Sequence, residues 1–127
     1  MILVDTSVWI DHLRKGTPAL AALLEEGQVL MHWFVLGELA CGNLRNREEV
    51  LRLLGELAMA PSVTDAEARA FIERHALMGK GIGYIDVHLL ASTALAAPAE
   101  LWTRDRRLGN VAADLGMAYA EAGGERA

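Results

Sequence analysis

The sequence predicts an α/β domain with a short central parallel β-sheet flanked by helices on both faces. Short apolar runs typical of buried strands alternate with longer stretches whose apolar spacing is typical of helices. Glycine, proline and capping residues mark the ends of these stretches, and no repeat or linker divides the chain. The chain has 127 residues, enough to bury a core, so we expect a single domain over residues 1–127 with a flexible tail at about 121–127.

The first half of the chain alternates in this way from its first residue. Thr17 is the expected N-cap of a helix whose first residue is Pro18. Asn46 and Glu49 have the spacing of a capping box. The expected strands are residues 1–4 and 28–33, and the expected helices are residues 6–16, 17–27, 34–44 and 46–57.

The second half continues the alternation around one very apolar helix. Thr64 and Glu67 repeat the capping-box spacing. The glycines of "GKGIG" predict a loop at 79–83, and Pro98 ends the apolar helix that follows this loop. The expected helices are residues 65–78, 84–97 and 104–116, and the expected strands are residues 100–103 and 117–120.

Composition limits the function classes. The net charge is −5, from 17 acidic and 12 basic residues, which argues against a general polyanion-binding surface. If four of the acidic residues were bound to cations, 13 free acidic residues would stand against 12 basic ones. The net charge therefore does not exclude a nucleic-acid substrate. Cys41 is the single cysteine, which fits a reducing cytoplasm, and we expect it to be a small buried hydrophobic residue. No segment has the apolar length of a membrane helix.

Four acidic residues occupy unusual positions. Asp5 directly follows the first strand and Asp105 follows "LWT", so both lie at carboxyl ends of expected parallel strands, where ligand crevices form. Glu38 shares a helical stripe with Phe34, and Asp86 lies in the first turn of a helix with no polar side. Each acid alone has an ordinary explanation. Asp5 and Asp105 fit helix caps, Asp86 fits the helix dipole, and Glu38 fits a residue at the edge of its stripe.

Their joint arrangement points to a cation site. Four carboxylates within ~6 Å of one another, at an effective dielectric constant of ~20, would repel by about 15 kcal/mol in total. A hard divalent cation relieves this repulsion and prefers oxygen ligands. Zinc is disfavoured because no cysteines and histidines have ligand spacing, and His88, two residues from Asp86, points elsewhere on the helix.

Four segments carry a family resemblance: "ILVDTSVWIDHL", "VLGELACG", "GYIDVHLLASTAL" and "LWTRDRRL". In series they resemble the signature segments of PIN-domain ribonucleases, and more narrowly the VapC toxins of bacterial toxin–antitoxin pairs. The resemblance implies a PIN-like fold and an acidic quartet of Asp5, Glu38, Asp86 and Asp105 that is catalytic and binds Mg²⁺ or Mn²⁺.

The resemblance also implies roles for neighbouring residues. Thr6, Ser7 and Thr103 would support the acids or a phosphate oxygen. Basic residues after the last strand are candidates for contacts with single-stranded or loop RNA: Arg104, Arg106 and Arg107.

The implied activity is that of a cytoplasmic, metal-dependent endoribonuclease toxin. It would form a homodimer, have no membrane association, and be neutralised by a cognate VapB-type antitoxin that covers the crevice. The chain departs from the family at Arg106, Arg107 and Leu108, where an acid and an aromatic residue are common, and in "HWFVLG", where a small hydroxyl residue is usual. Two alternatives remain open: a catalytically silent PIN-like binding module and a phosphoacceptor signalling domain.

Overall fold

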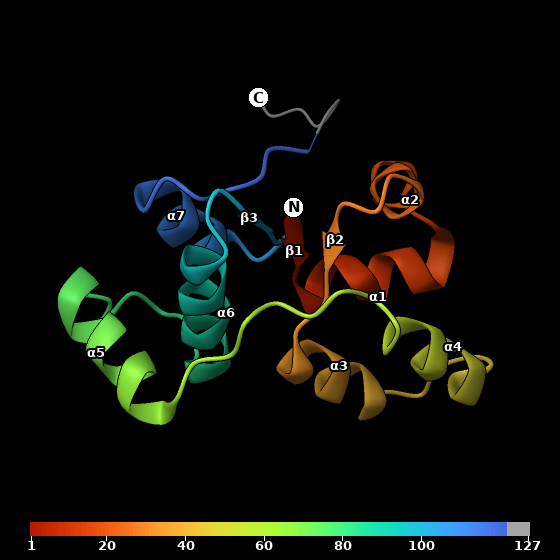
Figure 1. The fold of residues 1–127 in the computed structure, drawn as a ribbon, viewed down its shortest axis with the longest axis horizontal. Coiled ribbons are helices and arrows are strands. Elements are labelled where there is room, and N and C mark those ends of the chain that lie inside the picture. Colours follow the sequence, from red (N-terminus) through yellow and green to blue (C-terminus); the bar gives the residue numbers. More distant parts are fainter. Residues whose placement is uncertain (122–127) are drawn as a thin grey trace.

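The computed structural model describes residues 1–121, and within them three strands and seven helices alternate along the chain (Figure 1). The strands are β1 (Ile2–Val4), β2 (Val29–Leu30) and β3 (Glu100–Trp102). The helices are α1 (Thr6–Lys15), α2 (Pro18–Glu25), α3 (Trp33–Ala40), α4 (Arg47–Leu54), α5 (Asp65–His75), α6 (Tyr84–Leu95) and α7 (Arg106–Asp114).

The three strands form one parallel sheet in the order β2-β1-β3. The chain leaves β1 for β2 on one side and later reaches β3 on the other, so the carboxyl end of β1 is the point where strand order reverses. In open parallel sheets the ligand crevice forms at this point. Figure 1 shows α1 and α2 on one side of the sheet and α6 and α7 on the other, as the fold class predicts.

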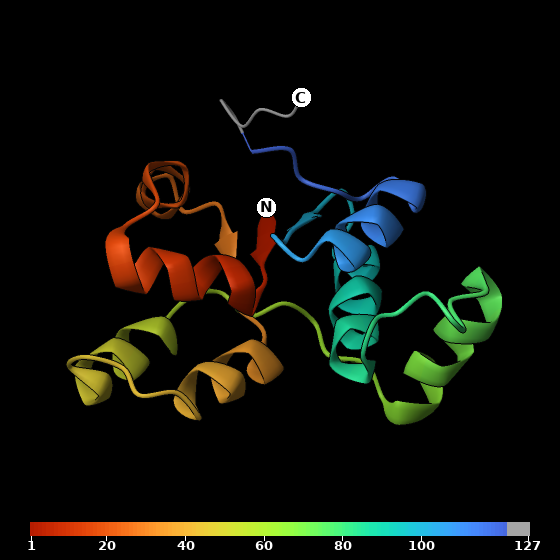
Figure 2. The same ribbon diagram turned by 180° about the vertical axis from the view of Figure 1, so that it is seen from behind.

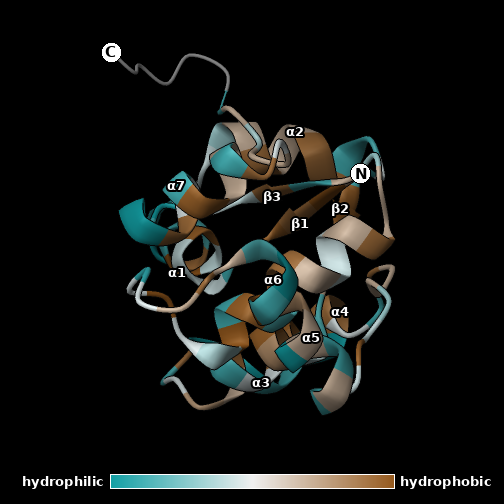
Figure 3. Cartoon of the chain, turned by 90° about the vertical axis from the view of Figure 1, so that its left-hand side faces the viewer, coloured by the Kyte–Doolittle hydropathy of each residue, from teal (hydrophilic) through white to brown (hydrophobic). Residues whose placement is uncertain are grey.

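The core forms around β1, whose three side chains are all buried, as expected for a strand covered on both faces. Trp9 of α1 and Trp102 of β3 are the largest side chains packed against it. Figure 3 shows β1 and β2 coloured as hydrophobic, with hydrophilic colour on the outer parts of the helices. Each fully buried aliphatic side chain contributes about 1.5–3 kcal/mol relative to an exposed one, so this core fixes where the strand ends lie.

The segment around residue 32 differs from the prediction. The second strand is shorter than 28–33, because Nδ1 of His32 accepts the backbone N–H of Phe34 and starts α3 at Trp33. The helix ends at Ala40 instead of residue 44. Cys41 is exposed just past that end, so its assignment as a buried hydrophobic residue was wrong.

The two predicted capping boxes have different outcomes. Thr64 and Glu67 form theirs, with both reciprocal hydrogen bonds present. Asn46 does not, because its backbone is left-handed (φ 52°) and its side chain makes no cap bond, while Glu49 pairs with Arg52 instead.

The last predicted elements are also shorter than expected. Residues 117–120 contribute a single bridge, between Ala118 and Leu101, instead of a strand. Of the expected tail at 121–127, only Glu121 lies within the described residues. Among residues 1–121, no helix is long and apolar enough to cross a bilayer.

Candidate active site at the carboxyl ends of the strands

Asp5 is held by two hydroxyl groups at the end of β1. It is only 7% exposed. Its Oδ2 accepts hydrogen bonds from Ser7 Oγ at 2.8 Å and Thr103 Oγ1 at 2.7 Å. Its side chain makes no cap bond to α1, although Asp5 occupies the N-cap position. The hydroxyls compensate in part for the desolvation of this carboxylate without neutralising it.

The same hydroxyls connect β1 to the segment that carries Asp105. Thr103 Oγ1 also accepts the backbone N–H of Asp105 at 3.0 Å, and Ser7 Oγ accepts that of Arg104 at 3.0 Å. Asp105 caps α7, since its Oδ1 accepts the N–H of Leu108 at 3.0 Å. The capping interpretation of Asp105 is therefore confirmed, and it places the residue beside the support of Asp5.

Glu38 reaches the crevice from α3. Its Oε1 accepts a hydrogen bond from Thr6 Oγ1, in the first turn of α1, at 2.6 Å. The contact joins α3 to the helix that follows Asp5. Glu38 is exposed, so water reaches this side of the site.

Asp86 enters from the first turn of α6 and is half-buried. Its Oδ2 accepts the backbone N–H of Gly83 at 2.9 Å. Burial raises the pKa of the Asp86 carboxyl above its usual value. The Gly83 N–H acts against this, and the negative charges of Asp5, Asp105 and Glu38 raise the pKa further. The structure thus brings the four predicted acids into mutual electrostatic range.

The four acids share one pattern of hydrogen bonding. In each, one carboxylate oxygen accepts a protein donor: Asp5 Oδ2, Glu38 Oε1, Asp86 Oδ2 and Asp105 Oδ1. Within the described residues, the second oxygen of each accepts no hydrogen bond from the protein. One oxygen is therefore fixed by the fold while the other remains available to a ligand.

This donor set matches a hard divalent cation in its chemistry, because all four donors are carboxylate oxygens. No three acidic, histidine or cysteine side chains of residues 1–121 stand close enough together to hold an ion as they are placed. The acids are neighbours that repel one another, and a bound cation would have to draw them inward.

The three candidate arginines differ in their surroundings. Arg104 pairs with Asp11 of α1 at 2.7 Å and with Glu121 at 3.0 Å, and it lies over the Trp102 ring. Arg106 and Arg107, in the first turn of α7, are exposed, and neither forms an ion pair within the described residues.

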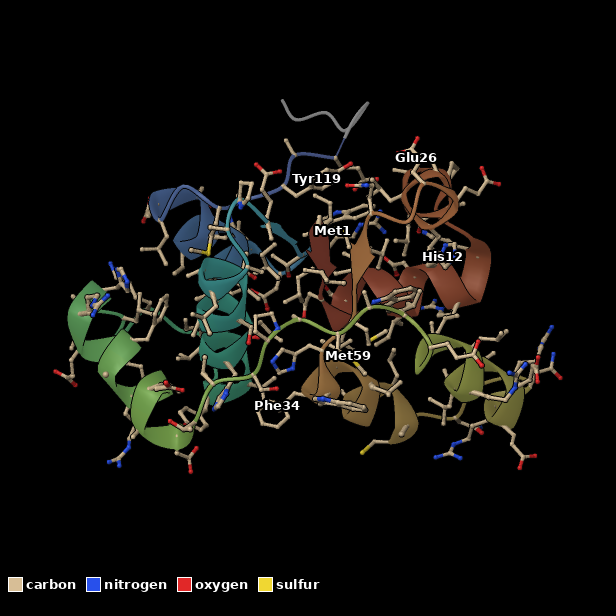
Figure 4. The ribbon with its side chains drawn as sticks, viewed as in Figure 1. Met1, His12, Glu26, Phe34, Met59 and Tyr119 are labelled. Atoms are coloured by element: carbon tan, nitrogen blue, oxygen red, sulfur yellow. The ribbon has the colours of Figure 1, made fainter. Side chains whose placement is uncertain are left out.

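A histidine–aromatic cluster, formed by His32, Phe34, Tyr84 and His88, lies between α3 and α6. The His88 ring contacts Phe34 and Tyr84 edge to face, with centroids 4.8 and 4.7 Å apart. Figure 4 shows Phe34 at the end of α3 that faces α6. Burial, and then the neighbouring charge of His88, lower the pKa of His32 to about 4.

The four acids lie apart from the best-formed hollows of the described surface. Two hollows elsewhere on the described surface lie between α5 and α6, around Phe71 and Leu95, and between α1 and the start of α4, around Leu13 and Val50. Neither is lined by any of the four acids.

Comparison with known proteins identifies the family. The model of the PIN domain matches residues 2–114, a range that contains all four acids. The chain belongs to the PIN-domain family. Ribonuclease VapC32 of Mycobacterium tuberculosis, in strains CDC 1551 / Oshkosh and ATCC 25618 / H37Rv, is 46% identical over 121 residues, covering 95% of this chain and 98% of VapC32. The resemblance to VapC-type PIN-domain ribonucleases is thereby confirmed.

A solved structure supports the PIN-domain fold. The crystal structure of FitAcB from Neisseria gonorrhoeae matches with a TM-score of 0.56 at 22% identity, covering 89% of this chain and 94% of that one. At this identity the likeness concerns the fold.

Sequence interpretation missed one acidic residue that contacts the segment between Thr103 and Asp105. Asp11 pairs with Arg104, the residue between Thr103 and Asp105. It lies four residues after Ser7 on α1 and so on the same helix face. That spacing was the available signal that Asp11 would face the crevice.

Proposed function

We propose that this chain is the toxin of a VapBC-type (type II) toxin–antitoxin pair, an endoribonuclease that hydrolyses RNA phosphodiester bonds with Mg²⁺ or Mn²⁺. One observation carries the proposal: four carboxylates converge at the reversal point of a parallel sheet, each with one oxygen held by the protein and one free. The 46% identity to a protein named as a ribonuclease supports RNA as the substrate.

The free oxygens of Asp5, Glu38, Asp86 and Asp105 are the groups that would hold the ion. A divalent cation there supplies a water of lowered pKa and stabilises the charge of an in-line displacement at phosphorus. Asp5 and Asp86 are the favoured direct ligands, and Asp105 would complete the site. Glu38 would bind the ion or orient the attacking water, because it is exposed to solvent, as Asp105 also is.

Three hydroxyl groups serve in this proposal as positioning residues. Ser7 and Thr103 hold one oxygen of Asp5, and Thr6 holds one oxygen of Glu38. Neutral donors orient a carboxylate while leaving its charge intact for the cation, which an arginine or lysine partner would not do. This explains why polar but uncharged residues surround the acids.

The proposed substrate is single-stranded or loop RNA, whose backbone can enter a narrow crevice with its bases turned outward. The first turn of α1, beside Thr6 and Ser7, suits a phosphate oxygen. Within residues 1–121, Arg106 and Arg107 are exposed and form no ion pair, whereas Arg104 is engaged with Asp11 and Glu121.

The proposed partners follow from the same acidic crevice. A cognate VapB-type antitoxin would place a cation against the four acids, which relieves their repulsion as a metal ion would. A homodimer of this chain is also proposed. Co-expression with the neighbouring small gene and size-exclusion chromatography of the free chain test these two proposals.

RNA cleavage by the purified chain tests the activity. Cleavage of a single-stranded RNA should rise with added Mg²⁺ or Mn²⁺ and disappear with EDTA. Asp5→Asn and Asp86→Asn should each lose nearly all cleavage. Asp114→Asn, which removes an exposed aspartate at the far end of α7, is the matched control and should retain it.

Other outcomes would indicate the alternative functions. Divalent-ion binding without cleavage of any RNA would indicate a silent PIN-like binding module. Transfer of phosphate from a small donor such as acetyl phosphate to Asp5 would indicate a phosphoacceptor domain. Cleavage by Asp5→Asn and Asp86→Asn at the wild-type rate would overturn the proposed site.

A further inference from the structure

The loop at 79–83 contains two glycines with left-handed backbone conformations, and they differ in their surroundings. A Cβ added at Gly79 (φ 74°) would meet nothing within 4 Å. A Cβ added at Gly81 (φ 82°) would lie 2.7 Å from Cδ of Arg107 and 2.9 Å from its Nη1. The Arg107 side chain therefore lies lengthwise against Gly81, in space that only a glycine leaves open.

This contact joins the segments that carry two of the acids. Arg107 is two residues after Asp105, and the N–H of Gly83, at the end of the loop, bonds to Asp86. Figure 2 shows the loop passing α6 on the side where α7 begins. The guanidinium is thus placed at the rim formed by α6 and α7, beside the acidic crevice.

Within residues 1–121, the Arg107 guanidinium has no carboxylate partner. Arg52 and Arg104 each pair with two carboxylates, whereas Arg107 forms no ion pair within residues 1–121 and is exposed. Lys80, also exposed, adds a second positive charge in the same loop.

We propose that Arg107, seated across Gly81, forms a phosphate-binding subsite for the RNA strand next to the scissile bond. The proposal rests on the proposed ribonuclease function and adds a specific contact to it. A guanidinium binds a phosphodiester through two parallel hydrogen bonds, and a seat that limits its rotamers reduces the entropy lost on binding. Gly81 acts as the positioning residue and Arg107 as the contact.

The two glycines provide a matched test. Gly79→Ala and Gly81→Ala both place an alanine at positive φ, at a similar backbone cost. Only Gly81→Ala displaces Arg107, and the displaced atoms belong to a flexible side chain, so the fold has room to adjust. The comparison therefore separates loss of the seat from strain in the loop.

Binding of a short fluorescein-labelled single-stranded RNA in EDTA, followed by anisotropy, measures the contact without cleavage. Arg107→Ala should weaken binding about tenfold and reduce the slope of log K against log salt by about 0.7, the value for one phosphate contact. Gly81→Ala should weaken binding in the same direction, and Gly79→Ala should match the wild type. Adding Gly81→Ala to Arg107→Ala should have no further effect.

Cleavage kinetics give the second readout. Arg107→Ala and Gly81→Ala should raise KM with little change in kcat, because Arg107 would hold a flanking phosphate equally well in the ground state and in the transition state. Equal behaviour of the two glycine variants, or an unchanged salt slope in Arg107→Ala, would overturn the subsite. If Arg107→Ala instead weakens only binding of an acidic partner segment, the arginine serves the partner and not RNA.

Failure of this inference is distinguishable from failure of the proposed function. Absence of RNA cleavage by the wild type would reject the ribonuclease proposal. The anisotropy comparison of the glycine variants would then still decide whether Arg107 binds an RNA phosphate.

Discussion

Helices α3 and α6 each contribute residues to two neighbouring regions, the acidic crevice and the histidine–aromatic cluster. The ionisable groups of these two regions differ in their environment. In the acidic crevice, Asp86 and Glu38 each keep one oxygen without a hydrogen bond from residues 1–121, and no basic side chain of those residues is bonded to either carboxylate. In the histidine–aromatic cluster, His32 is held neutral. Its Nδ1 accepts the N–H of Phe34, so the ring proton is on Nε2, facing Ser92 Oγ at 3.1 Å.

The carboxylates of the crevice therefore keep oxygens that a ligand could use, whereas the histidines of the cluster are enclosed by packed side chains. Burial opposes charge in both regions, raising the pKa of Asp86 and lowering that of His32. Among the described residues, each of the four acids keeps one oxygen without a protein hydrogen bond, whereas aromatic rings pack around His88 in the cluster. Variants that remove one group from each region can test this distinction.

The largest effect is expected from Asp86→Asn compared with His88→Phe. Losing an acid of the proposed metal site should lower kcat/KM for RNA cleavage by more than about 100-fold, the upper range for residues that only support a metal ligand. His88→Phe keeps an aromatic ring and removes Nε2, a buried nitrogen without a hydrogen-bond partner. Its cleavage should stay within a few-fold of the wild type, and a large loss in both variants would contradict the distinction.

The next effect is a pH dependence of stability from His32. Its folded pKa of about 4 lies below the usual 6.5, so the unfolded state binds a proton first as pH falls. The free energy of unfolding should be highest above pH 6.5 and fall by roughly 3 kcal/mol on the way to pH 4, from ~2.5 units at 1.36 kcal/mol each. Asp86, whose folded pKa is raised, contributes the opposite slope at the acidic end of this range.

Urea denaturation at a series of pH values measures this slope. In His32→Gln, which cannot titrate, the fall below pH 6.5 should be much smaller, whatever the absolute stability of the variant. An identical pH slope in the two proteins would show that His32 is not the group responsible.

Metal binding should stabilise the protein through the crevice alone. At a Mg²⁺ concentration 100 times its Kd, the expected gain in unfolding free energy is about 2.7 kcal/mol, which EDTA should remove. For a chain of this size the gain corresponds to roughly 10 °C in Tm. Thermal denaturation should show the shift in wild type and His88→Phe but not in Asp86→Asn. A shift that survives Asp86→Asn would place the ion elsewhere.

The smallest effects come from two partly or fully buried hydroxyls, one in each region. Thr103→Val removes a donor to Asp5, and Ser92→Ala removes the partner of His32. Each should cost about 1–3 kcal/mol of stability, because a polar group loses its partner. Only Thr103→Val should also lower cleavage, by about 10–100-fold. Equal activities in the two folded variants would indicate that Thr103 has no positioning role.

The fold and the convergence of the acids were predictable from local pattern and topology. Asp5 and Asp105 follow strands, and parallel strands bring their carboxyl ends to one edge. Asp86 had no solvent side on an apolar helix, and the structure places it half-buried against the other acids. These inferences depended on the spacing of apolar residues along the strands and helices, which can be read from a single sequence.

The failures occurred where tertiary contacts outweighed local preference. Asn46 has the right spacing from Glu49 for a capping box, but Arg52, one turn further along α4, takes the glutamate. His32 was placed in a strand, yet its ring starts α3. The contact between Arg107 and Gly81 depends on how α7 packs against the loop at 79–83. Residue spacing within either segment does not predict such a contact.

The direction of the sheet has a practical consequence for handling the protein. Met1 precedes β1 at the amino edge of the sheet, where its carbonyl accepts the N–H of Glu100, and Figure 1 shows the N-terminus at the end of β1 that lies away from α1. A purification tag or fluorescent reporter fused ahead of residue 1 would thus be anchored a full strand length from Asp5 at the carboxyl end of β1. Immobilised assays and single-molecule tethering could use that end without trimming the fusion.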